Sequence, residues 1–356
     1  MSQTAIPMTD DVNASSIVND SSWFPIDLEL VNETFEFVKT SPEELAGEFP
    51  ASQLVWRPQG ARHRLSVSAT QASWPDAAPI AANFIWNTGC CDSVLISRAL
   101  QKAGVSTSVR DPDILSRLAD MKRARVLGET KFQRMPRTVF GLLSRPMAAE
   151  AATIITGSPQ TSILADEAAR LTSGKMLFLY ADLRTFLISV NNESEIRRGF
   201  YRRMFSAIAG DGHEQATWPV ANLFQMTDLQ IAALVWHMQM TQFRRAMAVL
   251  GPRAASLDAD VFLQSPKTTL MRLDDFFGLN LGADFIDETV KGPLLRPRSE
   301  DGRAADLWER HQKYLEINPV LSGHIDQIVA KSYEICKAPH GVPLPNALIP
   351  TDKAYP

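Results

Sequence analysis

The sequence has little of what builds disulfide frameworks, metal centres or membrane anchors. Its 356 residues include three cysteines, two of them adjacent at Cys90 and Cys91, which is too few for a disulfide framework and fits reduced cytoplasmic thiols. The six histidines show no HExxH spacing and no CxxC pair occurs, so we expect no metal. The longest apolar runs, such as 80–86, are far too short to cross a bilayer. Because the N-terminus also lacks a secretory signal, we expect a cytoplasmic protein without a membrane span.

The chain also lacks an excess of positive charge. Its formal net charge is −4, with 45% hydrophobic residues, which is ordinary globular composition. Binding to nucleic acid through bulk electrostatics is therefore not expected. The length suits one large α/β domain with an appendage.

The N-terminal region reads differently from the rest of the chain. Residues 1–20 are polar and predict a disordered tail. Residues 28–48 predict a helix, because Ser41, Pro42 and Glu44 provide an N-cap, a first-turn proline and a capping box. Residues 50–79 are rich in Pro, Arg, Ser and Ala and predict a loop-like lead-in. We expect 1–79 to be a tail and helical lead-in, 80–340 the main domain, and 341–356 an extended tail.

From residue 80 onward, short apolar runs alternate with helical patterns. Such runs, separated by helices, indicate a parallel sheet that is covered on both faces. A second capping box, formed by Thr227 and Gln230, opens a long helix in the C-terminal part. We therefore predict an α/β fold with three layers, a central parallel sheet of about five strands and a largely helical C-terminal region. The expected strands are 80–86, 105–109, 152–156, 175–180 and, more weakly, 253–257.

The most informative segment is 84–100, where a buried strand ends in a tight turn and a helix begins at once. This arrangement points backbone N–H groups and the positive end of a helix dipole at one spot, which suits a phosphate or sulfate. Thr88 and Ser93 could add hydroxyl donors. The loop has one glycine and no lysine, unlike GxxxxGK[ST], so an ordinary strand–turn–helix corner is the alternative.

The letters N-T-G-C-C-D-S followed by V-L-I-S-R-A-L resemble the opening motif of P-loop sulfotransferase-like proteins. The resemblance implies a P-loop NTPase-like three-layer fold. In that family the loop binds the 5′-phosphosulfate of 3′-phosphoadenosine 5′-phosphosulfate (PAPS), the sulfuryl donor. By resemblance, this role falls on Thr88, Gly89, Cys90, Cys91, Asp92 and Ser93.

Three later segments agree with this family in order. Residues 109–115 are similar to its R/K-E-P-x-x-L segment, which makes Asp111 the candidate catalytic base; a helix cap or an ion pair with Arg110 is the alternative. Residues 178–190 resemble its 3′-phosphate segment, which implies that Arg184 and Ser189 hold the 3′-phosphate. Residues 260–279 resemble its P-x-x-T-L…F-F-G-L helix.

The chain also departs from the family pattern, as a divergent member would. Gly89 stands where relatives have a loop Arg or Lys, and Ala181 stands at the usual Arg of the 3′-phosphate segment. The basic run 196–203 offers Arg197 and Arg198 as a substitute clamp for the 3′-phosphate, or as a solvated helix face. Sulfuryl transfer needs cations or preorganised donors on the departing oxygens.

The resemblance predicts sulfuryl transfer from PAPS to a hydroxyl or amine acceptor, such as a small molecule, a glycan or a lipid, without a metal. Two alternatives stay open: a non-catalytic protein that binds a ligand or a partner protein, and an ATP- or GTP-dependent P-loop phosphotransferase. The missing loop lysine disfavours the phosphotransferase. A cysteine phosphatase is disfavoured because Arg98 falls outside a Cys-x5-Arg spacing from Cys91.

Overall fold

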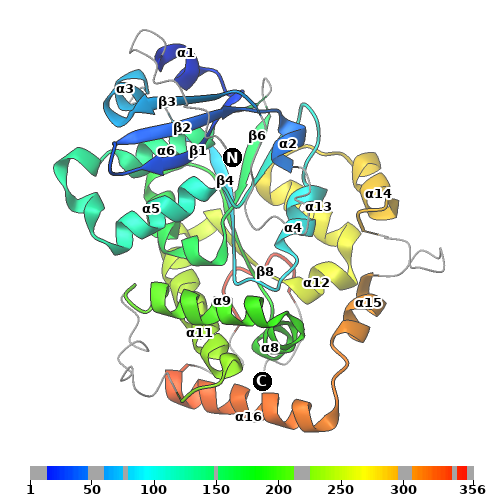
Figure 1. Cartoon of the computed structure of the whole chain (residues 1–356). Coiled ribbons are helices and arrows are strands. Elements are labelled where there is room, and N and C mark those ends of the chain that lie inside the picture. The colour runs from blue at the N-terminus through cyan, green and yellow to red at the C-terminus, as the bar shows by residue number, and fades with distance from the viewer. Residues whose placement is uncertain are drawn as a thin grey trace, which may run out of the picture.

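The computed structural model describes residues 14–46, 60–74, 79–147, 151–211, 225–295, 307–338 and 343–350. Its centre is a parallel sheet in the order β5-β6-β4-β7-β8 (Figure 1). The sheet confirms the predicted α/β fold with five parallel strands, and each strand lies within a residue or two of the predicted run. The strands are β4 (Ala82–Asn87), β5 (Ser106–Arg110), β6 (Ala152–Thr156), β7 (Met176–Tyr180) and β8 (Ala254–Asp258).

Helices cover both faces of this sheet, which gives three layers. On one face the ring of Phe84 contacts Phe140 of α6, and Phe178 of the neighbouring strand contacts Phe243 of α11. On the other face the hydroxyl of Ser108 donates to the carbonyl oxygen of Ser97 in α4. The helices between the strands are α4 (Ser93–Ala99), α5 (Asp113–Arg123), α6 (Met135–Leu143), α7 (Ala165–Leu171), α8 (Leu183–Asn192), α9 (Glu195–Ile208) and α11 (Asp228–Leu250). Short 3-10 turns are η2 (Val126–Gly128), η3 (Thr130–Phe132), η4 (Pro159–Leu164) and η6 (Gly251–Arg253).

The N-terminal region differs from the helix and loop that the sequence predicted. The helix predicted over 28–48 is wrong except at α2 (Pro42–Ala46), and the predicted loop over 50–79 contains a strand and a helix among its described residues. The segment 34–39 is a strand because Phe35 and Phe37 are buried on pairing with a segment far along the chain. The region forms an antiparallel sheet in the order β1-β2-β3 from β1 (Trp23–Glu29), β2 (Thr34–Lys39) and β3 (Arg62–Ser66), flanked by α1 (Ala14–Asn19) and α3 (Val67–Ser73).

One buried side chain fastens this N-terminal sheet to the main body. Arg145, just after α6, donates to the carbonyl oxygens of Ile17, Val18 and Asp20 at 3.1, 2.7 and 3.0 Å, and also to that of Trp23. Burial lowers its pKa to about 10, so the guanidinium is charged at neutral pH. The prediction of a disordered tail over 1–20 is wrong for Ala14–Asn19, which form α1. Residues 1–13 lie outside the described residues.

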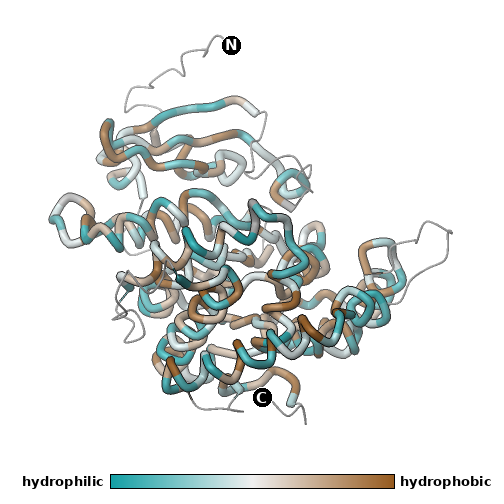
Figure 2. The backbone as a smooth tube through the Cα atoms, turned by 60° about the horizontal axis from the view of Figure 1, so that its bottom comes forward, coloured by the Kyte–Doolittle hydropathy of each residue, from teal (hydrophilic) through white to brown (hydrophobic). Residues whose placement is uncertain are grey.

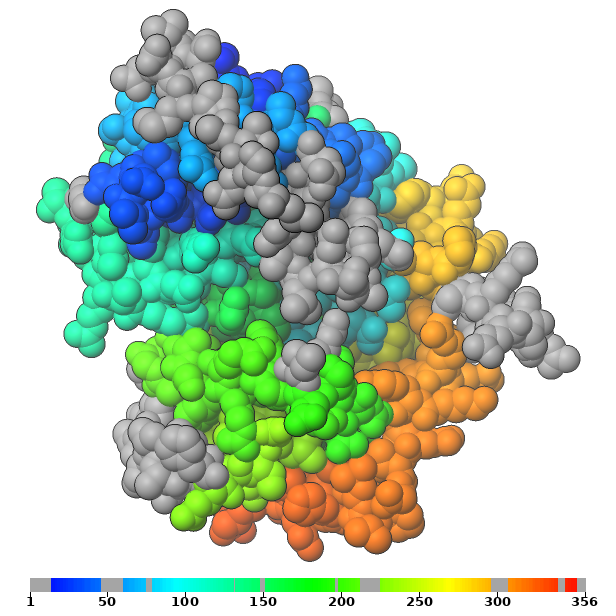
Figure 3. Space-filling view, in the orientation of Figure 1, coloured from blue at the N-terminus to red at the C-terminus, as the bar shows by residue number. Residues whose placement is uncertain are grey.

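The C-terminal part is helical, as predicted. Its capping box is present at Thr227 and Gln230. The predicted extended tail packs in part against the sheet, since Ala347 forms a parallel bridge with Ser256 of β8. Figure 3 shows the N-terminal residues at one end of the molecule and the C-terminal helices toward the other. These helices are α12 (Ala259–Gln264), α13 (Pro266–Phe277), α14 (Ala283–Lys291), α15 (Leu307–Tyr314) and α16 (Pro319–Cys336).

Hydropathy along the helices fits this layering. Figure 2 shows hydrophobic and hydrophilic residues alternating along most of them, as expected where one helix face packs on the core and the other meets solvent. No helix in the described ranges is long and apolar enough to cross a membrane.

Candidate functional site

The loop after β4 lies at the centre of the sheet's carboxyl edge. From β4 the chain passes to β5 at one edge of the sheet, whereas from β7 it passes to β8 at the other. Ligands of open α/β sheets bind at such a point, where the strand order reverses. Asn87 shapes the start of the loop: its side-chain oxygen accepts from the Gly89 amide at 3.0 Å, and its amide donates to the Gly157 oxygen at 2.6 Å.

The loop backbone adopts unusual dihedral angles. Gly89, Cys90 and Asp92 have φ values of 81°, 50° and 55°, a left-handed region that is costly for residues other than glycine. Such strain concentrates at ligand-binding segments. Gly89 is also closely packed, because a Cβ there would lie 3.3 Å from both Pro159 Cγ and the Tyr201 hydroxyl. The phenol of Tyr201, from α9, contacts Cys90 Sγ at 3.2 Å.

A cavity of about 350 Å³ opens beside this loop. It lies between the start of α4, the end of α8, α12 and the C-terminal helix α15. We call it the loop pocket. Its lining residues are Cys90, Asp92, Leu95, Ser189, Glu193, Leu263, Leu307, Arg310, His311 and Tyr314.

Three of the residues predicted to bind the donor line the loop pocket: Cys90, Asp92 and Ser189. Thr88 and Cys91 do not, because both side chains are buried. The Thr88 hydroxyl donates to the Gly89 oxygen at 3.2 Å, and burial raises the pKa of the Cys91 thiol. Gly89 and Ser93 are partly exposed next to the pocket without lining it.

Of the predicted arginines whose side chains are described, Arg184 and Arg198 do not line the pocket. Arg184 points to α16, where it donates to Asp326 at 2.9 Å and to Ser322 at 2.8 Å; its role in holding a 3′-phosphate stays a prediction. Arg198 donates to the Asn191 and Glu193 carbonyl oxygens at 3.3 and 2.7 Å, which ties α9 to the end of α8. The side chain of Arg197 lies outside the described residues.

Asp111 lies at the carboxyl end of β5, and β6 separates that strand from the loop. Two strand spacings put it about 10 Å from the β4 end, and it does not line the loop pocket. Its backbone is strained, with φ at 40°. The carboxyl keeps contact with solvent, yet surrounding protein raises its pKa to about 6 through desolvation, against the opposing charge of Arg110. The structure therefore places the predicted base outside the loop pocket.

Charged groups of both signs line the loop pocket. Desolvation raises the pKa of the Asp92 carboxyl, with a lowering effect from His311 and a smaller raising effect from Asp260. His311 Nε2 lies 3.0 Å from Asp260 Oδ1. Arg310 is exposed and forms no ion pair with any described residue. A bound anion would therefore meet Arg310 as an attractive group and Asp92 as a repulsive one.

Sequence reasoning did not single out Arg310 and His311 of α15. His311 and Arg310 follow the loop by more than 200 residues, and no spacing connects them to it. The Tyr314 hydroxyl donates to the Ser189 oxygen at 3.2 Å, and Asn192 donates to the Tyr314 oxygen at 2.7 Å. These bonds hold α15 over the end of α8, so the helix closes the pocket.

Two hydroxyls at the end of β6 also have no hydrogen-bond partner among the described residues. Thr156 Oγ1 and Ser158 Oγ are buried without one, which is costly for hydroxyl groups. They lie between Asp111 and the loop in sheet order. A polar ligand that extends from the loop along this edge could satisfy both hydroxyls.

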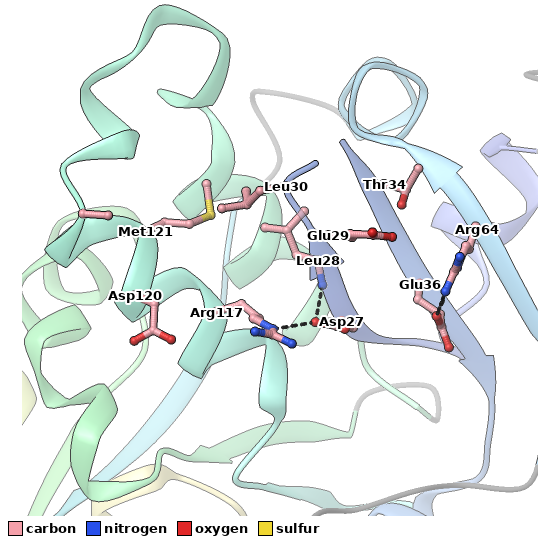
Figure 4. Close-up of a pocket in the computed structure, with 11 residues that line it drawn as sticks. Asp27, Leu28, Glu29, Leu30, Thr34, Glu36, Arg64, Arg117, Asp120 and Met121 are labelled. Carbon is pink, nitrogen blue, oxygen red and sulfur yellow. Dashed lines mark hydrogen bonds and ion pairs between the residues drawn. The ribbon is translucent and has the colours of Figure 1, made fainter. Parts of the chain in front are cut away.

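A larger cavity of about 540 Å³ lies elsewhere, between the N-terminal sheet and α5 (Figure 4). Its arginines are already engaged: Arg117 pairs with Asp27 at 2.9 Å and Arg64 with Glu36 at 3.0 Å. Because both arginines are paired with carboxylates, the described lining of this cavity offers no exposed cation comparable to Arg310. The described residues contain no cluster of three or more His, Cys, Asp or Glu side chains suited to a metal ion.

Comparison with known proteins gives structural similarities only. No family model matches the chain, and no curated protein gives a significant match. Similar solved structures include the sulfotransferase domain from the curacin biosynthetic pathway, with 15% identity, a TM-score of 0.41, and coverage of 75% of this chain and 94% of that one. The sulfotransferase domain of the Synechococcus PCC 7002 olefin synthase has 15% identity, a TM-score of 0.38, and coverage of 76% and 92%. Sulfotransferase STF9 from Mycobacterium avium has 9% identity, a TM-score of 0.40, and coverage of 72% and 77%.

Proposed function

We propose that this protein transfers a sulfuryl group from PAPS to a hydroxyl or amine acceptor, with the donor's phosphosulfate at the loop after β4. The observation that carries the proposal is the strained loop at the strand-order reversal, which opens on a pocket containing Ser189 and Arg310. Phosphosulfate carries negative charge, and the exposed guanidinium of Arg310, which has no ion partner among the described residues, is suited to bind it.

The fit is incomplete, and the mismatch is specific. Asp92 occupies the loop where an anion would lie, and Glu193 also lines the pocket. Arg310 supplies the positive charge that the loop itself lacks. We therefore expect binding of the donor to be weaker than in a site with a loop lysine and to depend on the charge state of Asp92.

The first test is a thermal-shift titration with the product adenosine 3′,5′-bisphosphate. A ligand that binds the folded state at 100 times its Kd stabilises that state by about 2.7 kcal/mol. We expect the unfolding temperature to rise for the wild type and less for Arg310→Ala. Arg272→Ala is the matched control, because Arg272 is an exposed arginine of α13 outside the pocket.

Two other outcomes separate the alternatives. Stabilisation by Mg·ATP but not by adenosine 3′,5′-bisphosphate would replace the proposal with a phosphotransferase. If neither nucleotide raises the unfolding temperature at millimolar concentration, the result would favour a non-catalytic binding protein.

A further inference from the structure

We infer that His311 takes the proton from the acceptor, and that Asp260 positions its imidazole. The inference rests on the proposed sulfuryl transfer and names a catalytic residue that the loop motif does not contain. His311 lines the same pocket as Cys90 and Asp92 of the loop. A proton acceptor must lie within reach of the group that reacts, and the loop pocket meets this condition for His311.

The geometry of the pair fits this role. His311 Nε2 lies 3.0 Å from Asp260 Oδ1, and the two side chains are 13% and 8% exposed. Asp260 is itself fixed at the carboxyl end of β8, because its amide donates to Asp258 Oδ1 at 3.0 Å. When Nε2 carries the hydrogen donated to the carboxylate, Nδ1 is the nitrogen left with a lone pair for a proton.

Acidic groups surround the His311 imidazole. Asp260 of α12 contacts it, and Asp92 of the loop and Glu193, the C-cap of α8, line the same pocket. Its own helix contributes Arg310 and Tyr314. A carboxylate that orients an imidazole and stabilises its cation is the arrangement of a catalytic His–Asp pair.

The step balances without a further reactant. The acceptor oxygen forms a bond to the donor's sulfur, and the bond from sulfur to the 5′-phosphate oxygen breaks. The electron pair of that bond leaves on the phosphate oxygen, and the acceptor's proton moves to Nδ1 of His311. Asp111, one strand beyond β6, is the competing candidate for the same proton.

The first experiment observes the pair directly and needs no donor. Nitrogen NMR of the ¹⁵N-histidine-labelled protein reports which ring nitrogen of His311 carries hydrogen, with His311→Asn used to assign the signal. We expect hydrogen on Nε2 and none on Nδ1 in the neutral ring, and a change of this pattern in Asp260→Asn. Hydrogen on Nδ1 in the wild type would overturn the inference.

The second experiment measures conversion of PAPS to adenosine 3′,5′-bisphosphate with water or phenol as acceptor. General-base loss lowers rates about 10²–10⁴-fold, so we expect a fall of at least about 100-fold in kcat for His311→Asn and Asp260→Asn. Affinity for adenosine 3′,5′-bisphosphate should stay close to that of the wild type. The control is His324→Asn, an exposed histidine of α16 outside the pocket.

The outcomes are distinguishable. If the nucleotide binds and His311→Asn keeps its turnover while Asp111→Asn loses it, the assignment of His311 is wrong and the proposed function stands. If the wild type does not bind the nucleotide, the proposed function fails, and the catalytic role of His311 fails with it. The inference is supported by three results together: the nucleotide binds, His311→Asn and Asp260→Asn both lose turnover, and Asp260→Asn changes the acidic limb of the pH profile. His311 is then the base and Asp260 the residue that positions it.

Discussion

Replacing Asp92 by asparagine should strengthen anion binding at the loop. Asp92 is the N-cap of α4, but its side chain makes no capping hydrogen bond, so asparagine removes charge without removing a bond. Two unit charges 4 Å apart interact by about 4 kcal/mol at an effective dielectric constant of 20. Because the carboxyl is partly exposed, we expect about 1.4 kcal/mol, or a tenfold gain in affinity for adenosine 3′,5′-bisphosphate.

The pH dependence of the affinity for adenosine 3′,5′-bisphosphate is a second test of the role of Asp92. Desolvation raises the pKa of Asp92, and a bound anion would raise it further, so binding takes up a proton. Wild-type affinity should therefore rise as the pH falls toward that pKa, and the Asp92→Asn variant should lose this part of the dependence. The neutral variant also avoids the cost of a desolvated carboxylate, so its stability should not fall.

Isothermal titration calorimetry at several pH values and ionic strengths measures both effects. Asp284→Asn, at an exposed position of α14, is the matched control and should leave affinity unchanged. Equal affinity of wild type and Asp92→Asn, with parallel pH curves, would refute the reasoning, because the carboxylate would then not face the anion.

Two further predictions concern stability. Arg145→Met leaves backbone carbonyls of the N-terminal region without their buried donor and should lower the free energy of unfolding by about 1–3 kcal/mol; hydrogen exchange should show the loss of protection first at 14–39, and unchanged protection there would contradict the fastening role. Gly157→Ala puts a Cβ 2.7 Å from Thr161 Oγ1 and 2.8 Å from the Trp86 ring, which should cost about 1–3 kcal/mol in urea unfolding. Gly210→Ala, which meets no atom within 4 Å, is its control, and equal midpoints for the two variants would count against the packing argument.

The sequence predicted the central sheet well because its signals are local. Each parallel strand is a short apolar run, and each crossover helix has its own periodicity and breakers. The capping box at Thr227 is a contact between residues three apart. The position of the loop after β4 follows from the same local pattern, so the candidate site could be located to within a few residues.

The N-terminal sheet and the walls of the loop pocket were decided by tertiary structure. Residues 34–39 become a strand because β3, about 25 residues later, supplies their partners. The capping signal at Ser41 is confirmed only for the short helix α2 that follows it. Arg184 pairs with Asp326 of α16, a partner that no local pattern reveals. His311 meets Asp260 because α15 folds back over the carboxyl end of the sheet. Local sequence determines where strands, helices and a tight loop form, whereas the charges that face that loop come from segments brought together only by packing.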